Sequence, residues 1–505
     1  MMKDHSALEL NEPSSMVGTE QSSSVHPTPR EPGYLFHSLL QWFITDWRTH
    51  KYLFFGALLL LINVSVTVVY YVNYPGVAFD ADTPAYLVVA DRIYFHTYPY
   101  FLVDAWRLPG YPLLIAFVYA FAGYRNWLAV SAAQGVLFVL ATMEIYVLAI
   151  LVLKRTWMAF LIGLIVGTNV ILISYVKPIM SEGLALWLLT TLALALVYYV
   201  RTLRLHAFWL VVVCLVLLVF TRPEWLYLPV PLFAFVLLVA VRRGVRWRSG
   251  LVVLLNIVVA LTCIYTLVGI YIYINTWQNN YPGLTAVENF NLMGKVLQYN
   301  MQDEAPPQYA QISHQLDILV VKDRDPYHIL PYVPALAKDD SLPAGTMARA
   351  IILHHPAEFL VKSLPLFPPS LTSYYDSIRP NIHGPFDEPL ALMKSFDRIL
   401  YQANVFFLLC IPLWLVLFCW RRWRTQQLPL EMGAIVLLAS YALIITTLGG
   451  YRPDDYMRVH IVFDPLLIFV VWGSIFLGAR LLWRRGPAMY ARFAGRVHSK
   501  STNKA

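Results

Sequence analysis

Long apolar runs separated by short polar segments dominate the chain after residue 51. A bilayer core of about 30 Å needs about 20 apolar residues in a helix. A further run at 110–123 has only about 14 residues, which favours an interfacial or re-entrant helix over a span. The pattern predicts an all-α polytopic membrane protein with about ten transmembrane helices. The runs of spanning length lie near 52–74, 127–152, 157–175, 181–200, 207–221, 226–241, 250–274, 399–419, 430–449 and 459–481.

The positions of lysine and arginine predict which side each loop faces. Basic residues are enriched in cytoplasmic loops. If 110–123 does not span and the N-terminus is inside, every major basic cluster falls in the cytoplasm. If 110–123 did span, the clusters after it would move outside. We therefore expect ten spans and two cytoplasmic termini. The clusters are Lys154/Arg155, Arg201/Arg204, Arg242/Arg243/Arg246/Arg248, Arg421/Arg422/Arg424 and the tail after Arg484.

This orientation places the loops rich in acidic and aromatic residues on the exoplasmic side. A connection as long as 275–398 is uncommon unless it folds by itself, so we expect a small α-rich extracytoplasmic domain there. The expected organisation is a disordered cytoplasmic tail and helix entry at 1–50, a transmembrane module at 51–274 containing an interfacial helical first exoplasmic loop at 75–126, the domain at 275–398, transmembrane helices at 399–482, and a basic cytoplasmic tail at 483–505.

Composition supports a multi-pass integral membrane protein of the plasma or inner membrane. Hydrophobic residues make up 58% of the chain and charged residues 13%, against about 25% charged residues in an average soluble domain. The net charge is +8, but the basic residues lie beside apolar runs and form no stripe, so membrane lipids are the expected surroundings and nucleic acid is not an expected partner. The four cysteines lie inside apolar runs and indicate neither a disulfide framework nor a zinc site.

Two carboxylates, Asp80 and Asp82, stand out in the first exoplasmic loop. Asp82 is followed by Thr83 and Pro84, a pattern typical of an N-cap and the start of a helix, here running to about Phe95. Capping accounts for one aspartate but not for a pair. The alternative is a carboxylate held beside the outer leaflet, where it can take a proton from a hydroxyl. One residue can serve both roles.

Charged residues also lie where the apolar runs meet the outer face. Arg107 is either a snorkelling anchor or a fixed guanidinium suited to a lipid phosphate. Arg458 begins the last span, at the depth of a lipid phosphate. Thr221 and Glu224 have the spacing of a capping box, which favours a structural role for Glu224 and leaves Arg222 unused. Ser181-Glu182 starts a helix, so capping and a favourable helix dipole account for this pair.

These spaced motifs resemble the GT-C superfamily of integral-membrane glycosyltransferases, in the branch with protein O-mannosyltransferases and the lipid A aminoarabinose transferase. The similarity covers most of residues 51–480. Thr83 stands where relatives have Glu, and Ala85 where some have a basic residue. The motifs are Asp82-x-x-x-Tyr86, Arg107-Leu108-Pro109-Gly110-Tyr111-Pro112-Leu113, Ser181-Glu182, Arg222-Pro223, His355-Pro356 and Arg458 followed by Asp464-Pro465.

The resemblance implies transfer of a sugar from a polyprenyl-phosphate donor to an acceptor hydroxyl on the exoplasmic face, with inversion. The acceptor class, whether glycan, lipid or protein, stays open. The missing Glu leaves dependence on a divalent cation (Mg or Mn) open, and Asp80 is a candidate replacement for that acid. The implied roles are Asp82 as general base with help from Asp80, then Arg107, Arg222 and Arg458 as ligands of the donor phosphate, and Tyr86, Tyr111, Glu182 and His355 as substrate-binding residues.

Two other functions compete with this interpretation. An oligosaccharide ligase or polymerase would use a diphosphate-linked glycan, but the acidic pair of the first loop and the Arg-x-Pro-x-Tyr segment disfavour it. A transporter or flippase places polar residues near the midplane of broken helices, often in internal repeats. Here Glu144 is the main ionisable residue deep in a span, and the two halves show no repeat. His354 and His355 lack metal-ligand spacing to other His or Cys, which disfavours zinc.

Overall fold

The structure is a computed structural model that describes residues 32–97, 101–245, 247–374, 384–419, 427–451 and 453–480. Across these residues every regular element is an α- or 3-10 helix, and none is a strand. Two compact units divide the chain at residues 1–51 and 52–505. The described part of the first unit is the beginning of α1 (Pro32–Asn73), whose residues from Tyr52 onward belong to the second unit. The predicted all-α architecture is confirmed.

Seven helical stretches of the described chain are long and apolar enough to cross a membrane. An eighth is α5 (Thr156–Gly167) with α6 (Val170–Val176), a pair bent by 52°. The predicted spans 207–221 and 459–481 correspond to the shorter α8 (Leu205–Thr221) and to a helix over 464–480. Five of the seven spanning stretches are single helices or parts of one: His50–Asn73 of α1, α4 (Trp127–Leu153), α7 (Glu182–Thr202), Ser249–Asn279 of α10 (Trp247–Asn279) and Leu428–Gly449 of α19 (Gln427–Gly449). The other two join consecutive helices. Pro223–Arg242 contains η1 (Pro223–Trp225) and α9 (Pro229–Arg242), and Asp387–Cys419 contains α17 (Asp387–Ala403), η6 (Asn404–Phe406) and α18 (Phe407–Cys419).

A short apolar helix, α3 (Gly110–Ala122), follows the first loop. Its 13 residues give a length of about 20 Å, too short for a 30 Å bilayer core, as its sequence predicted. Gly110 begins this helix against the end of α8. A Cβ atom at Gly110 would lie 2.5 Å from Thr221 Oγ1 and 2.7 Å from the Phe220 carbonyl oxygen. Glycine therefore permits a contact that brings the segment before α3 close to the segment after α8.

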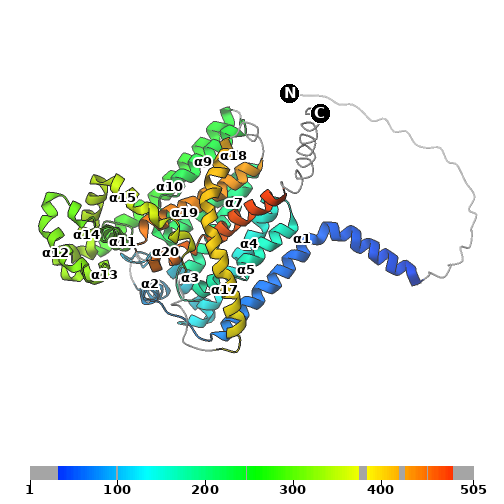
Figure 1. Cartoon of the computed structure of the whole chain (residues 1–505), viewed down its shortest axis with the longest axis horizontal. Helices are drawn as coiled ribbons and strands as arrows, with labels where there is room; N and C mark the ends of the chain where they lie inside the picture. The colour runs from blue at the N-terminus through cyan, green and yellow to red at the C-terminus, as the bar shows by residue number, and fades with distance from the viewer. Residues whose placement is uncertain are drawn as a thin grey trace, which may run out of the picture. The chain divides into compact units, whose positions relative to one another are not determined.

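A second hydrophobic core forms within the region expected to be a separate domain. Its buried members include Phe290, Met293, Leu316 and Met347. Figure 1 shows α11 to α15 lying together as one group. The expected boundary at 398 falls inside α17, which continues into α18. The helices here are α11 (Val287–Gln298), η2 (Gln302–Glu304), η3 (Pro307–Tyr309), α12 (Ala310–Val320), α13 (Pro326–Ile329), η4 (Leu330–Tyr332), α14 (Pro334–His354), α15 (Pro356–Ser363), η5 (Leu364–Leu366) and α16 (Pro369–Thr372).

The main core packs the apolar faces of α4, α5, α7, α8 and α19. Two short helices carry charged residues beside it, α2 (Thr83–Phe95) and α20 (Pro453–His460). α20 is anchored by a fully buried pair in which His460 Nδ1 lies 2.9 Å from Asp464 Oδ1. The other ring nitrogen of His460, Nε2, lies 2.5 Å from the carbonyl oxygen of Ser373. These contacts fix the helix that carries Arg458.

Candidate active site

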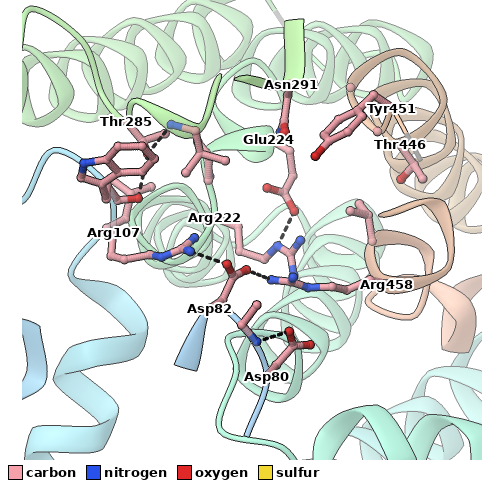
Figure 2. A pocket seen from close by; sticks show the side chains of 18 of the residues that line it. Asp80, Asp82, Arg107, Arg222, Glu224, Thr285, Asn291, Thr446, Tyr451 and Arg458 are labelled. Atoms are coloured by element: carbon pink, nitrogen blue, oxygen red, sulfur yellow. Dashed lines mark hydrogen bonds and ion pairs between the residues drawn. The ribbon is translucent and has the colours of Figure 1, made fainter. Parts of the chain in front are cut away.

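A cavity of about 650 Å³ lies where the first loop, the α8–α9 connection, α11, α13 and the ends of α19 and α20 meet. Figure 2 shows the side chains that project into it. Six of the nine candidate residues line the cavity, namely Asp80, Asp82, Tyr86, Arg107, Arg222 and Arg458. Segments separated by more than 370 positions in the sequence therefore converge on one site.

Asp82 lies between two arginines. Its Oδ1 accepts a hydrogen bond from Arg107 Nη2 at 2.5 Å, and its Oδ2 accepts one from Arg458 Nη2. The expected helix starts at Thr83 and ends at Phe95, as predicted, but the Asp82 side chain accepts no capping hydrogen bond. The capping interpretation of this carboxylate is therefore wrong, because both of its oxygens are directed to guanidinium groups.

The electrostatic surroundings keep Asp82 ionised. Burial alone would raise the pKa of its carboxyl group, but the positive charges of Arg458 and Arg107 outweigh burial and leave the pKa below its ordinary value. The same two charges that favour the carboxylate also weaken it as a base.

The carboxylate of Glu182 connects Arg458 to Arg222. This side chain is fully buried at the start of α7. Its Oε1 lies 2.6 Å from Arg458 Nε and 3.0 Å from Arg222 Nη1. Ser181, one residue earlier, makes no side-chain capping bond and instead accepts a hydrogen bond from the Tyr86 hydroxyl at 3.2 Å. The helix dipole and two guanidinium groups together stabilise a charge that burial would otherwise disfavour.

Arg222 pairs with a second carboxylate, that of Glu224. The expected capping box is wrong, because the Thr221 hydroxyl donates back to the Leu217 carbonyl oxygen at 2.7 Å and caps nothing. Sequence reasoning assigned Glu224 to that box and so missed it as a cavity residue. The sequence Arg222-Pro223-Glu224, which places a carboxylate two residues after an arginine, is the pattern that could have indicated Glu224 as a cavity residue.

Local contacts set the position of Arg107. The carboxylate of Asp104 accepts hydrogen bonds from the backbone N–H groups of Trp106 and Arg107, at 2.8 and 2.9 Å. The guanidinium then lies over the ring of Tyr86, with its Cζ 4.8 Å from the ring centre. A cation over an aromatic face is attracted by the ring quadrupole. Turn geometry and the aromatic ring thus direct Arg107 toward the cavity.

Asp80 lines the cavity wall but does not contact the arginine cluster. Its carboxylate accepts the N–H of Ala81 at 2.5 Å, and Figure 2 shows it directed away from Asp82. The backbone N–H of Asp80 donates to Thr83 Oγ1 at 2.8 Å, and that hydroxyl donates to the Ile179 carbonyl oxygen at 3.1 Å. These bonds attach the first loop to the segment that leads into Glu182.

Three candidate residues lie outside the cavity lining, namely Glu182, which contacts the arginines from behind, Tyr111 and His355. Tyr111 is fully buried behind Tyr86, with ring centres 5.0 Å apart, and its hydroxyl donates to Gln134 Oε1 at 3.0 Å. Tyr111 thus supports the site from behind. The imidazole of His355 lies at the start of α15, where its Nε2 is 3.6 Å from Glu304 Oε2. His355 is not brought together with the arginine cluster.

Aromatic and polar side chains from other elements form the remaining wall together with Asp325 and His328, and no local pattern marks most of them as site residues. Asn291 of α11 projects into the cavity toward Glu224 (Figure 2). Tyr327 of α13 stacks on Phe290, with ring centres 4.4 Å apart and an interplanar angle of 9°. Tyr451 donates to Asp325 Oδ1 at 3.3 Å. This wall offers hydrogen-bonding groups and an aromatic face opposite the charged cluster.

The carboxylates of the site do not form a metal site. Among the residues that the structure describes, no three His, Cys, Asp or Glu side chains are grouped so that they could hold a metal ion. Both carboxylate oxygens of Asp82 accept hydrogen bonds from arginines, and the carboxylate of Asp80 is directed away from Asp82. The donor set therefore does not fit a resident divalent cation.

Comparison with known proteins gives a distant structural similarity. No family model matches the chain, and no curated protein matches it. Among solved structures, the chain is similar to the oligosaccharyltransferase AglB of Archaeoglobus fulgidus in complex with an inhibitory peptide and a dolichol-phosphate, at 13% identity and a TM-score of 0.43, covering 86% of this chain and 52% of that one. An oligosaccharyltransferase of Archaeoglobus fulgidus in the apo form matches at 13% identity and a TM-score of 0.44, covering 86% of this chain and 52% of that one. The chain spans about half the length of these proteins, and similarity of this degree does not assign a family or an activity to it.

Proposed function

We propose that the protein is a membrane glycosyltransferase that moves a sugar from a polyprenyl-phosphate donor to an acceptor hydroxyl. The observation that carries this proposal is the convergence of Arg107, Arg222 and Arg458 with Asp82 on one cavity (Figure 2). Guanidinium groups match the geometry and charge of a phosphate. A lone surface ion pair would need only one arginine, whereas three at one cavity suit an anionic ligand.

The arginines would hold the donor phosphate and stabilise its charge as it leaves. A phosphate is a leaving group of low basicity, so it needs charge stabilisation more than a strong acid. Preorganised donors aimed at developing negative charge lower the barrier most effectively in a site that excludes water. Arg222 is buried and Arg107 and Arg458 are partly buried, which favours this role.

In the reaction, the acceptor oxygen forms a bond to the anomeric carbon as the bond from that carbon to the phosphate oxygen breaks on the opposite face. The electron pair leaves with the polyprenyl phosphate, and the configuration inverts. Asp82 takes the proton of the acceptor hydroxyl as general base. Asp80 is the second acid near it and would assist by its charge. No step needs a metal ion.

The acceptor, whether glycan, lipid or protein, would lie against the wall built by α11, α13 and Tyr451. The stacked ring of Tyr327 and the amide of Asn291 offer an aromatic face and hydrogen bonds suited to a polyhydroxylated or peptide group. The positive-inside pattern places these loops on the exoplasmic side, so we infer that the reaction takes place there.

The test measures sugar transfer from a short-chain polyprenyl-phosphate sugar in purified wild type, Asp82→Asn and Arg107→Ala. Asp82→Asn should express and fold yet lose transfer, while Arg107→Ala should bind polyprenyl phosphate more weakly. Near-normal transfer in Asp82→Asn would remove the assigned base. If wild type binds no polyprenyl phosphate, the transferase proposal fails.

The surroundings of Glu144, the main ionisable residue deep in a span, do not support a transport function. The carboxylate of Glu144 accepts hydrogen bonds from Trp187 Nε1 at 3.1 Å, from Thr190 Oγ1 at 2.8 Å and from Thr191 Oγ1 at 2.9 Å. A buried carboxylate whose oxygens are bonded by neutral donors of its own bundle is suited to holding α4 and α7 together.

A further inference from the structure

The chain's own carboxylates already neutralise the arginine cluster. Arg107 pairs with Asp82, Arg458 with Asp82 and Glu182, and Arg222 with Glu182 and Glu224. Three guanidinium charges therefore face three carboxylate charges. An incoming phosphate gains little from a neutral cluster unless it takes the place of one of these carboxylates.

The three carboxylates differ in how easily they can give up an arginine. Glu182 is fully buried at the start of a long helix, and moving it would leave two guanidinium groups without their shared partner. Among the described residues, the carboxylate of Glu224 pairs with one arginine, Arg222, from a neighbouring position of the same short turn. Asp82 lies at the cavity surface, and its side chain is 25% exposed.

Asp82 also has the geometry of an exchangeable ligand. It makes one hydrogen bond with each of its two arginines, through a different oxygen for each. A phosphate offers several oxygens and can replace both bonds at once. Within the described chain, Nε of Arg107 is buried and has no hydrogen-bond partner, so this guanidinium keeps a donor for a second oxygen of the ligand.

We propose that the donor phosphate and Asp82 compete for Arg107 and Arg458, so that Asp82 becomes an effective base only after the donor has bound. The inference rests on the proposed function and adds its order of events. The phosphate accepts the guanidinium hydrogen bonds, Asp82 turns toward the cavity, and its carboxylate then takes the proton of the acceptor hydroxyl. A carboxylate held by two guanidinium groups is a weak base, whereas one released from them is a stronger base.

This order couples the activity of the base to donor binding. With no donor bound, the base is neutralised and activates neither water nor an acceptor. With the donor bound, the charge that held the base is used to hold the phosphate. Glu182 keeps Arg222 and Arg458 in place throughout, which is why it is a positioning residue and not the one that exchanges.

The test is the affinity for a short-chain polyprenyl phosphate without a sugar, so that no turnover occurs. Wild type, Asp82→Asn and Asp80→Asn are compared in detergent at one pH and one salt concentration. Asp82→Asn should bind about tenfold more tightly than wild type, because no carboxylate competes for the arginines. Asp80→Asn is the matched control, since it removes the same charge from the same cavity without removing an arginine contact, and it should change the affinity by less than about threefold.

The outcomes separate the inference from the proposed function. If Asp82→Asn binds no more tightly than Asp80→Asn while wild type binds and transfers sugar, the exchange is refuted and the transferase stands. If wild type and both variants fail to bind polyprenyl phosphate, both proposals fall. Asp82→Ser removes the same carboxylate and supplies the comparison should Asp82→Asn not fold, with the same expected gain.

Discussion

Replacing Glu182 by glutamine isolates the contribution of the buried ion cluster. The change keeps the shape of the side chain and removes its charge. Glu182 is fully buried, and its Oε1 lies 2.6 Å from Arg458 and 3.0 Å from Arg222. Removing one partner of a buried pair costs about 3–5 kcal/mol, because the remaining charge is left buried without compensation.

The expected loss lies at the lower end of that range. Arg458 keeps Asp82 and Arg222 keeps Glu224, so neither guanidinium loses all of its partners. We expect Glu182→Gln to lower the free energy of unfolding by about 3 kcal/mol, which in a unit of this size corresponds to a fall of about 3 °C in the thermal midpoint. Thermal unfolding of the purified protein in detergent measures it.

A matched control distinguishes burial from the loss of any ion pair. Glu288 lies 3.1 Å from Arg349, and both side chains are at least 40% exposed. Exposed pairs contribute about 0–1 kcal/mol, so Glu288→Gln should leave the thermal midpoint almost unchanged. Equal midpoints for Glu182→Gln and Glu288→Gln would refute the reasoning, because the buried cluster would then contribute no more than a surface pair.

Two further predictions address packing and pH. Gly110→Ala should destabilise the protein by about 1–3 kcal/mol through overpacking against the end of α8. Gly269→Ala is the control and should not destabilise it, because the added Cβ atom meets nothing within 4 Å. Equal thermal stabilities of the two variants would contradict the close contact at Gly110. Because two arginines lower the pKa of Asp82, the stability that this ion pair contributes is fully present above the ordinary aspartate pKa of about 3.9 and is lost only as the pH falls through the lower folded value. The acid limb of kcat/KM for the donor should therefore lie below about pH 3.9, and a limb at pH 5 or above would show that Asp82 is not the base or is not held by the arginines.

The helical architecture can be predicted from local sequence, because hydrophobic length acts locally. A run of about 20 apolar residues must form a helix in a bilayer whatever its neighbours are. The same holds for α3, whose length favoured an interfacial or re-entrant helix over a span, and for α2, whose start at Thr83 followed from Asp82, Thr83 and Pro84. From the residues alone, Arg107 and Arg458 were also expected at the depth of a lipid phosphate, whereas the phosphate role of Arg222 was implied only by the resemblance to the GT-C superfamily.

The pairing of those charges depends on tertiary packing and could not be predicted from local patterns. Local patterns favoured a capping role for Glu224 and offered one for Asp82, since the nearest backbone N–H groups are always within reach in the sequence. In the folded chain both carboxylates face guanidinium groups, and a charge-assisted bond to an arginine that is buried or partly buried is stronger than a cap to a neutral N–H group. Asp82 and Arg458 are separated by 376 residues, and their contact depends on helices packing around them. Asn291 and Tyr327 reached the cavity in the same way, through the position of α11 and α13, which no local pattern encodes.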